Sequence, residues 1–121
     1  MQYMALIYAD EAQWATLADE ERGETYARYR ALSQDAQEAG VMVGGSELGP
    51  TRDATTVRVR GGETLVTDGP YAEVKEALGG YFLFECGSIE EALDWAARIP
   101  AAEHGAVEVR PVHADPEEER L

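Results

Sequence analysis

Cysteine and lysine are almost absent from the 121-residue sequence, which contains one of each, Cys86 and Lys75. A single cysteine cannot form an internal disulfide, so a reducing cytoplasm is the expected compartment. No apolar run approaches the roughly 20 residues that a membrane helix requires. The first four residues also lack the basic start of a secretory signal. We therefore expect a cytoplasmic protein without a membrane segment.

Basic residues are scarce as well. Ten Lys and Arg residues stand against 24 Asp and Glu residues, which gives a net charge of −14. Binding to nucleic acid requires a basic surface that neutralises phosphates, and binding to anionic lipid requires one too. We therefore expect neither nucleic acid nor a membrane as a partner. Because copies with this charge repel one another, any dimer interface should be apolar or formed by a sheet.

What is present is enough apolar material for one folded domain. Hydrophobic residues make up 45% of the chain, and a chain of this length can bury a core without disulfides or metals. We assign residues 1–114 to a single domain and residues 115–121 to an acidic tail.

The first half of the chain predicts a strand, a helix and a second strand. The nearly continuous apolar run at 3–8 is typical of a buried strand, and the polar residues 10–13 of a loop. Apolar residues recur at helical spacing within 16–39, which predicts one long helix. An extended segment begins at 41–43, and the glycines at 44–45 predict a bulge or the close approach of another backbone.

The second half begins with a predicted hairpin. Strict alternation at 55–60, the glycine pair at 61–62 and the apolar residues of 63–67 form two strands joined by a tight turn. A turn at 68–71 follows, and residues 72–78 are compatible with one or two helical turns.

The remaining elements repeat the order strand, helix, strand. Residues 81–86 predict a strong strand, Ser88 and Glu91 form a capping box that begins a helix, and Pro100 ends it. The alternating segment 107–112 contains a proline, which suits an edge strand. The order β-α-β, hairpin, β-α-β predicts an α+β, ferredoxin-like sheet with both helices on one face. The other face needs an apolar cover, so we expect a two-fold homodimer.

Several segments resemble one known family. Residues 66–76 (VTDGPYAEVKE) are similar to the VTDGPFAETKE signature of the YCII-related (DGPF domain, YciI-like) family, and residues 78–81 (LGGY) are similar to its continuation. Residues 92–100 and 107–112 resemble its second helix and last strand. The resemblance implies a ferredoxin-like fold of the dimeric α/β-barrel type, a homodimer and a cleft near the DGP turn. Some members of this family are fused to, or encoded beside, extracytoplasmic-function sigma factors, so the resemblance also implies a sigma factor as a candidate partner.

Asp68 and His104 are the candidate catalytic residues. A carboxylate at a strand end, held by Gly69 and Pro70, serves as a general base if burial raises its pKa, and His104 with Asp68 would form a dyad for proton abstraction. The structural alternatives are an Asx turn at Asp68 and a solvated loop position for the histidine. A distant dehydrochlorinase relative has a proposed His-Asp pair, but the first helix of this chain contains no histidine.

Five further residues are candidate ligand contacts. Lys75 would bind an anionic or phenolate oxygen, or would form only a surface ion pair. The aromatic side chains would supply apolar walls and the charged ones polar groups. No compact metal-ligand motif is present, so we expect no metal and no cofactor. The five residues are Tyr8, Tyr71, Glu73, Lys75 and Tyr81.

Two functions therefore remain open at this point. The first is a cofactor-free enzyme that acts on a small molecule, such as an aromatic one, with Asp68 in the cleft. The second is a non-enzymatic ligand-binding or regulatory module associated with an extracytoplasmic-function sigma factor. A dry, aromatic cleft would favour the enzyme, and a shallow cleft would favour the module.

Overall fold

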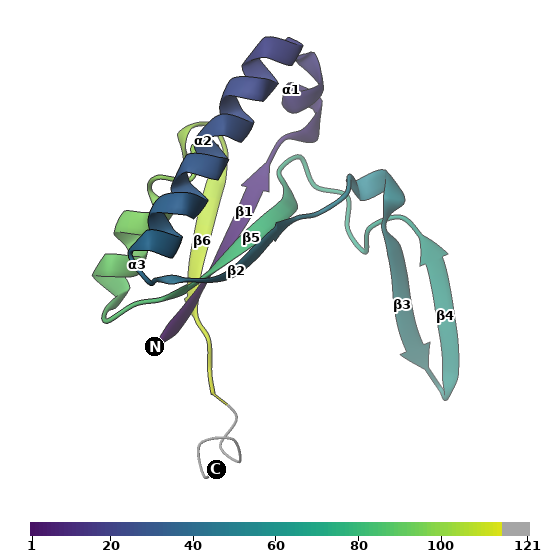
Figure 1. The fold of residues 1–121 in the computed structure, drawn as a ribbon. Helices are drawn as coiled ribbons and strands as arrows, with labels where there is room; N and C mark the ends of the chain where they lie inside the picture. Colours follow the sequence, from purple (N-terminus) through teal and green to yellow (C-terminus); the bar gives the residue numbers. More distant parts are fainter. Residues whose placement is uncertain (115–121) are drawn as a thin grey trace.

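The computed structural model describes residues 1–114, and the predicted acidic tail at 115–121 lies outside the described residues. A four-stranded sheet forms the body of the protein, with the strand order β2-β5-β1-β6 and every neighbouring pair antiparallel (Figure 1). A second sheet contains only β3 and β4. The six strands of the described residues are β1 (Gln2–Ala9), β2 (Met42–Glu47), β3 (Thr55–Arg60), β4 (Glu63–Asp68), β5 (Ala77–Glu85) and β6 (Ala106–Pro111).

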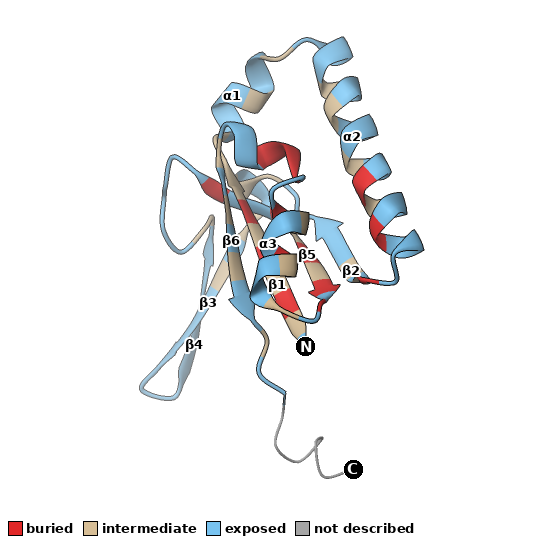
Figure 2. Cartoon of the chain, turned by 90° about the vertical axis from the view of Figure 1, so that its left-hand side faces the viewer, coloured by how far each residue is buried: buried red, intermediate tan, exposed pale blue. Residues whose placement is uncertain are grey.

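The helices lie together on one face of the larger sheet (Figures 1 and 2). They are α1 (Glu11–Thr16), α2 (Asp19–Glu38) and α3 (Ile89–Ala96). Without the β3–β4 hairpin, the chain order is strand, helices, strand, strand, helix, strand, which is compatible with a ferredoxin-like sheet. The α+β class and the inserted hairpin predicted from sequence are therefore confirmed. None of the helices within residues 1–114 combines the length and apolarity needed to cross a membrane.

The core lies between the sheet and the helices because alternate strand residues point to opposite faces. Ala5 of β1 and Phe82 and Phe84 of β5 are buried on the helix side, where they meet Leu32 of α2. On the other side, which we call the open face, the alternate residues are only partly covered. The open face consists of Met4, Leu6 and Tyr8 of β1 with Tyr81 and Leu83 of β5.

The first helical region differs from the prediction. Residues 10–13 are not a loop, since the Asp10 carboxylate accepts a hydrogen bond from the Ala12 amide at 2.9 Å and begins α1. The guanidinium of Arg22 donates to the carbonyls of Trp14 and Ala15 at 3.2 and 3.0 Å, which satisfies the last turn of α1. The predicted single helix at 16–39 is therefore wrong at its start, and two helices take its place.

The β3–β4 hairpin, which we call the arm, projects from the body on the side of the sheet away from the helices (Figures 1 and 2). Its turn residues Gly61 and Gly62 have φ angles of 56° and 81°, the left-handed region that a two-residue hairpin turn requires. The predicted hairpin is confirmed. Its strands pair only with each other and not with the larger sheet.

The segment that returns from the arm to the sheet also differs from the prediction. Residues 72–78 contain no helix; irregular backbone leads into β5, which begins at Ala77 paired with Ala9. Gly80 of β5 and Gly45 of β2 lie where the two strands approach closely. A Cβ atom on Gly45 would lie 2.9 Å from the carbonyl oxygen of Tyr81. The close approach predicted at 44–45 is confirmed, as is a register shift between Met42 and Gly44.

Candidate functional site

The DGP turn connects the arm to the body. Asp68 is the last residue of β4, and Gly69 follows with a φ angle of 100°, which favours glycine. The Gly69 amide donates to the carbonyl of Ala54 at 2.7 Å, and its carbonyl accepts from the Thr56 hydroxyl at 2.8 Å. Pro70 then fixes the direction of the chain. These bonds hold the turn in one conformation.

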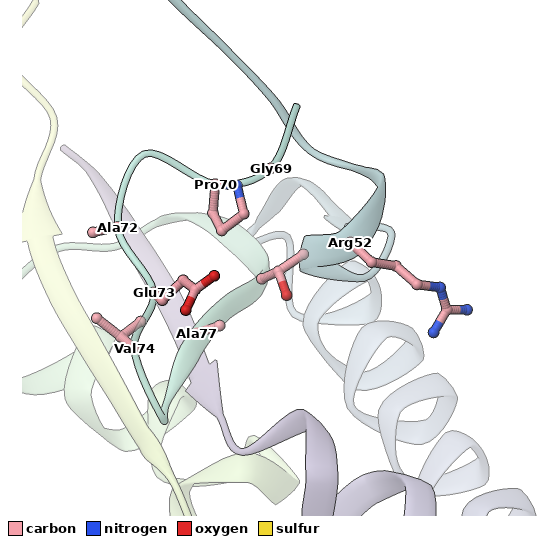
Figure 3. A pocket seen from close by; sticks show the side chains of 8 residues that line it. Arg52, Gly69, Pro70, Ala72, Glu73, Val74 and Ala77 are labelled. Carbon is pink, nitrogen blue, oxygen red and sulfur yellow. The ribbon is translucent and has the colours of Figure 1, made fainter. Parts of the chain in front are cut away.

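Beneath this turn lies a depression of about 450 Å³, which we call the DGP cleft (Figure 3). Glu73 extends its carboxylate into the cleft, whereas the guanidinium of Arg52 points away from it. Most of the other walls are apolar. The lining residues are Thr51, Arg52, Gly69, Pro70, Ala72, Glu73, Val74 and Ala77.

The wall opposite Glu73 is fixed by a contact between distant segments. The short 3₁₀ helix η1 (Thr51–Asp53) begins at Thr51, whose amide and hydroxyl both donate to the Glu11 carboxylate at 2.9 and 2.8 Å. A carboxylate at a helix start satisfies amides that have no partner within the helix. Glu11 therefore attaches η1 to α1 and keeps this side of the cleft in place.

The two predicted catalytic residues lie in different parts of the fold. Asp68 is exposed and is not among the residues that line the DGP cleft. His104 follows the 3₁₀ helix η2 (Pro100–Glu103), whose Glu103 forms an ion pair with Arg28 of α2. Within residues 1–114, no hydrogen bond joins Asp68 to His104, and no backbone amide donates to the Asp68 carboxylate. The Asx turn is thus not observed, and the catalytic roles stay predictions.

Among the predicted ligand contacts, Glu73 alone lines the cleft. Lys75 is exposed on the segment beside it. Tyr8 and Tyr81 lie on the open face of the sheet. Tyr71 is 81% exposed and lies close enough to Tyr8 to affect the ionisation of its phenol. The aromatic residues thus belong to the open face and its margin rather than to the cleft, and their role in binding stays a prediction.

Tyr8 has a partner that the sequence did not reveal. Its hydroxyl donates to the carboxylate of Glu108 in β6 at 3.4 Å, a long hydrogen bond. Burial raises the pKa of the Tyr8 phenol, and the charge and hydrogen bond of Glu108 raise it further. At neutral pH the phenol is therefore a hydrogen-bond donor and not a base.

A pH titration tests this pair. The tyrosinate absorbance of the protein, minus that of Tyr8→Phe, should have a midpoint above the ordinary Tyr value of 10.0, because the neutral phenol is favoured. Glu108→Gln should move the midpoint down, but only in part, since burial is the larger cause. Glu63→Gln, in the exposed arm, is the control and should not move it. A midpoint at or below 10.0 would contradict the assignment.

Other site residues were also missed by sequence reasoning. Thr51 and Arg52 lie between the predicted extended segment and the predicted hairpin, and no motif in the sequence marks them. Within residues 1–114, no three His, Cys, Asp or Glu side chains cluster in a way that could hold a metal ion. The expectation that no metal is required stays a prediction.

The fold and the cleft define a small α+β protein with one helix-covered face and a site beside its DGP turn. Residues 1–114 match the YCII-related domain, and the chain belongs to that family. It is similar to the uncharacterized protein R00369 of Rhizobium meliloti (strain 1021), with 40% identity over 114 residues, 93% of this chain and 92% of that protein. The family assignment from the DGP and LGGY segments is confirmed.

Proposed function

We propose that this protein is a small-molecule-binding module whose ligand occupies the DGP cleft. The observation that carries the proposal is the Glu73 carboxylate, which points into a cleft with apolar walls from Pro70, Val74 and Ala77 (Figure 3). Ligand sites in proteins combine such walls with a few polar groups that fix orientation, and volumes of about 300–1,000 Å³ are typical.

The chemistry of the cleft limits the class of ligand. An ionised carboxylate accepts hydrogen bonds and donates none, so Glu73 favours a ligand with an amine or hydroxyl group. The walls formed by Pro70, Ala72 and Val74 favour an apolar body. We therefore propose a small, largely apolar amine or alcohol, which Glu73 orients by a charge-assisted hydrogen bond.

An enzyme is the second candidate, and the pair of Tyr8 and Glu108 is the observation that favours it. The Glu108 carboxylate could accept a proton from a substrate on the open face, while the Tyr8 phenol stays protonated and donates a hydrogen bond. Asp68, the predicted base, is exposed and outside the cleft, which favours binding over catalysis at the DGP turn. An association with a sigma factor stays a prediction.

We also propose that the protein is a homodimer in which a second copy covers the open face. The support is the half-covered apolar row of Met4, Leu6 and Leu83, which lies beside Glu108 and Arg110 of β6. A two-fold axis through this face would bring the same patch of both copies together. Charges of opposite sign at its margin would let two acidic chains approach.

A thermal-shift screen with Glu73→Gln tests the binding site. A panel of small amines, alcohols and carboxylic acids should contain amines or alcohols that raise the melting temperature of the wild type. Glu73→Gln should lose most of this shift, because an amide holds a cation poorly. Glu76→Gln, on the same exposed segment but outside the cleft, should keep it.

Asp68→Asn separates the structural proposal from the prediction made on sequence. We expect this variant to bind as the wild type does, since Asp68 does not line the cleft. Loss of binding in Asp68→Asn with full binding in Glu73→Gln would reject the proposed site and return the role to Asp68. Stabilisation by carboxylic acids alone would also reject it.

A further inference from the structure

We propose that the DGP cleft selects a primary amine in its cationic form, held between the Glu73 carboxylate and the Thr51 hydroxyl. Glu11 is a positioning residue in this site, because it makes the Thr51 hydroxyl a hydrogen-bond acceptor toward the cleft. The inference rests on the binding site proposed above and narrows its ligand from an amine or alcohol to an ammonium ion.

The direction of the hydrogen bond between Thr51 and Glu11 is fixed by their chemistry. A threonine hydroxyl has one proton and two lone pairs, whereas an ionised carboxylate only accepts. The Thr51 hydroxyl therefore donates its single proton to Glu11 at 2.8 Å, and the Thr51 amide donates to the other oxygen of the same carboxylate at 2.9 Å. Only the lone pairs of the hydroxyl remain for a ligand in the cleft, which Thr51 lines.

The side chains that line the cleft thus offer acceptors to a ligand. Glu73 extends its carboxylate inward, whereas the guanidinium of Arg52, the other donor group among the lining side chains, points away from the cleft (Figure 3). A head group that satisfies both Glu73 and Thr51 must donate at least two hydrogen bonds. An ammonium group has three protons to donate, whereas an alcohol has one and would leave one of the two acceptors to water.

The charge around the cleft separates the two ligand classes further. Residues 51–53 and 68–77, which form its walls, contain four acidic residues against two basic ones, and the whole chain carries a net charge of −14. Glu11 adds a further negative charge behind Thr51. Such a field raises the local concentration of cations and leaves that of a neutral alcohol unchanged. An alkyl amine is protonated at neutral pH, as the lysine side chain is, so the field favours it.

A purely structural role for the contact between Glu11 and Thr51 has different consequences. To cap η1, Glu11 requires only the Thr51 amide. The bond from the hydroxyl would then be incidental, and its removal would leave ligand binding unchanged. Thr51→Val separates the two roles, because valine keeps the amide and the branched shape of threonine and lacks only the hydroxyl.

The test uses three probes that share one ring and differ in the head group: cyclohexylamine, cyclohexanol and cyclohexanecarboxylate. NMR titration of the whole isotope-labelled chain detects the millimolar affinities that are expected for ligands of this size. We expect the amine to shift the amides of residues 69–77 and to bind roughly tenfold more tightly than the alcohol, because it makes one more charge-assisted hydrogen bond. The carboxylate should not bind.

Variants of the wall at Thr51 then assign the selectivity. Thr51→Val should weaken amine binding about tenfold, since a hydrogen bond to a charged group is lost, and should change alcohol binding by less than about threefold. Thr51→Ser, which keeps the hydroxyl, should rescue the amine affinity. Thr64→Val makes the same change on the exposed arm, outside the cleft, and is the matched control. In Glu11→Gln, the new amide can donate to the Thr51 oxygen and free the hydroxyl proton for the cleft, so the preference for amine over alcohol should fall.

Salt provides a further measurement that needs no variant. Amine binding should weaken as ionic strength rises, because salt screens the charges around the cleft, and alcohol binding should not respond. Equal wild-type affinities for amine and alcohol, or unchanged amine binding in Thr51→Val, would overturn this inference; the cleft would still stand if Glu73→Gln abolished binding. Amine binding that persists in Glu73→Gln, or no binding of any probe, would reject the cleft and this inference together.

Discussion

Gly105→Ala is expected to lower the free energy of unfolding by about 3 kcal/mol. Gly105 connects η2 to β6, where the chain passes directly over the end of β1. A Cβ atom on this residue would overlap the carbonyl oxygen of Tyr8 and would lie 3.2 Å from both the Ala101 carbonyl oxygen and the Ala9 Cα. All three neighbours are backbone atoms, so relief requires movement of a strand. Urea unfolding followed by circular dichroism measures the loss.

Gly23→Ala is the matched control for this substitution. Gly23 lies within α2, and a Cβ atom there meets nothing within 4 Å. Since alanine is the better helix former, this variant should gain up to about 1 kcal/mol. The same chemical change is thus expected to have opposite signs at the two positions. Equal effects, or a stable Gly105→Ala, would contradict the close passage of residue 105 over the end of β1.

Phe84→Ala is expected to cost about 3–5 kcal/mol, the usual range for removal of a buried phenylalanine. Phe84 is 1% exposed at the centre of the core. Its ring stacks on Phe82 with centroids 5.5 Å apart and lies 6.2 Å from the ring of Trp95 in α3. Its loss would leave a cavity between sheet and helix that these rigid rings cannot fill. Calorimetry or chemical unfolding measures the difference.

The control for Phe84→Ala is Leu93→Ala on the outer side of α3. Leu93 is exposed, and alanine is a favourable helix residue, so the change should stay within about 1 kcal/mol. A loss at Phe84 no larger than that at Leu93 would mean that α3 does not pack on β5. The comparison thus tests the central contact between the layers.

Much of the fold could be predicted because its signals are local. The apolar runs at 3–8 and 81–86 and the alternation at 55–60 each predict a strand from a segment of only six residues. The helix α1 was missed because it has only six residues and its end is satisfied by Arg22, a tertiary contact. Residues 77–78 are not helical because Ala77 and Leu78 pair with Ala9 and Tyr8 of β1, and such pairing overrides local propensity.

The candidate site was only partly predictable for the same reason. Glu73 was found because it belongs to the DGP segment, where the family resemblance is specific. Thr51 contacts Glu11 across 40 residues of sequence, and Tyr8 contacts Glu108 across 100. No local pattern encodes such contacts. The position of Asp68 outside the cleft depends on how the arm leaves the body, which is likewise a long-range feature.

The outer strands of the larger sheet bear on how this protein avoids fibril growth. The Val112 amide bonds to Gln2 of β1 at 2.9 Å, so the alternation of β6 directs position 111 toward the free edge, where proline has no N–H to offer. At the opposite edge, the irregular register at Val43 interrupts β2. Neither edge therefore offers an uninterrupted row of backbone hydrogen-bonding groups to a strand of another molecule. Edge-to-edge pairing into amyloid-like fibrils is disfavoured at both edges of this sheet.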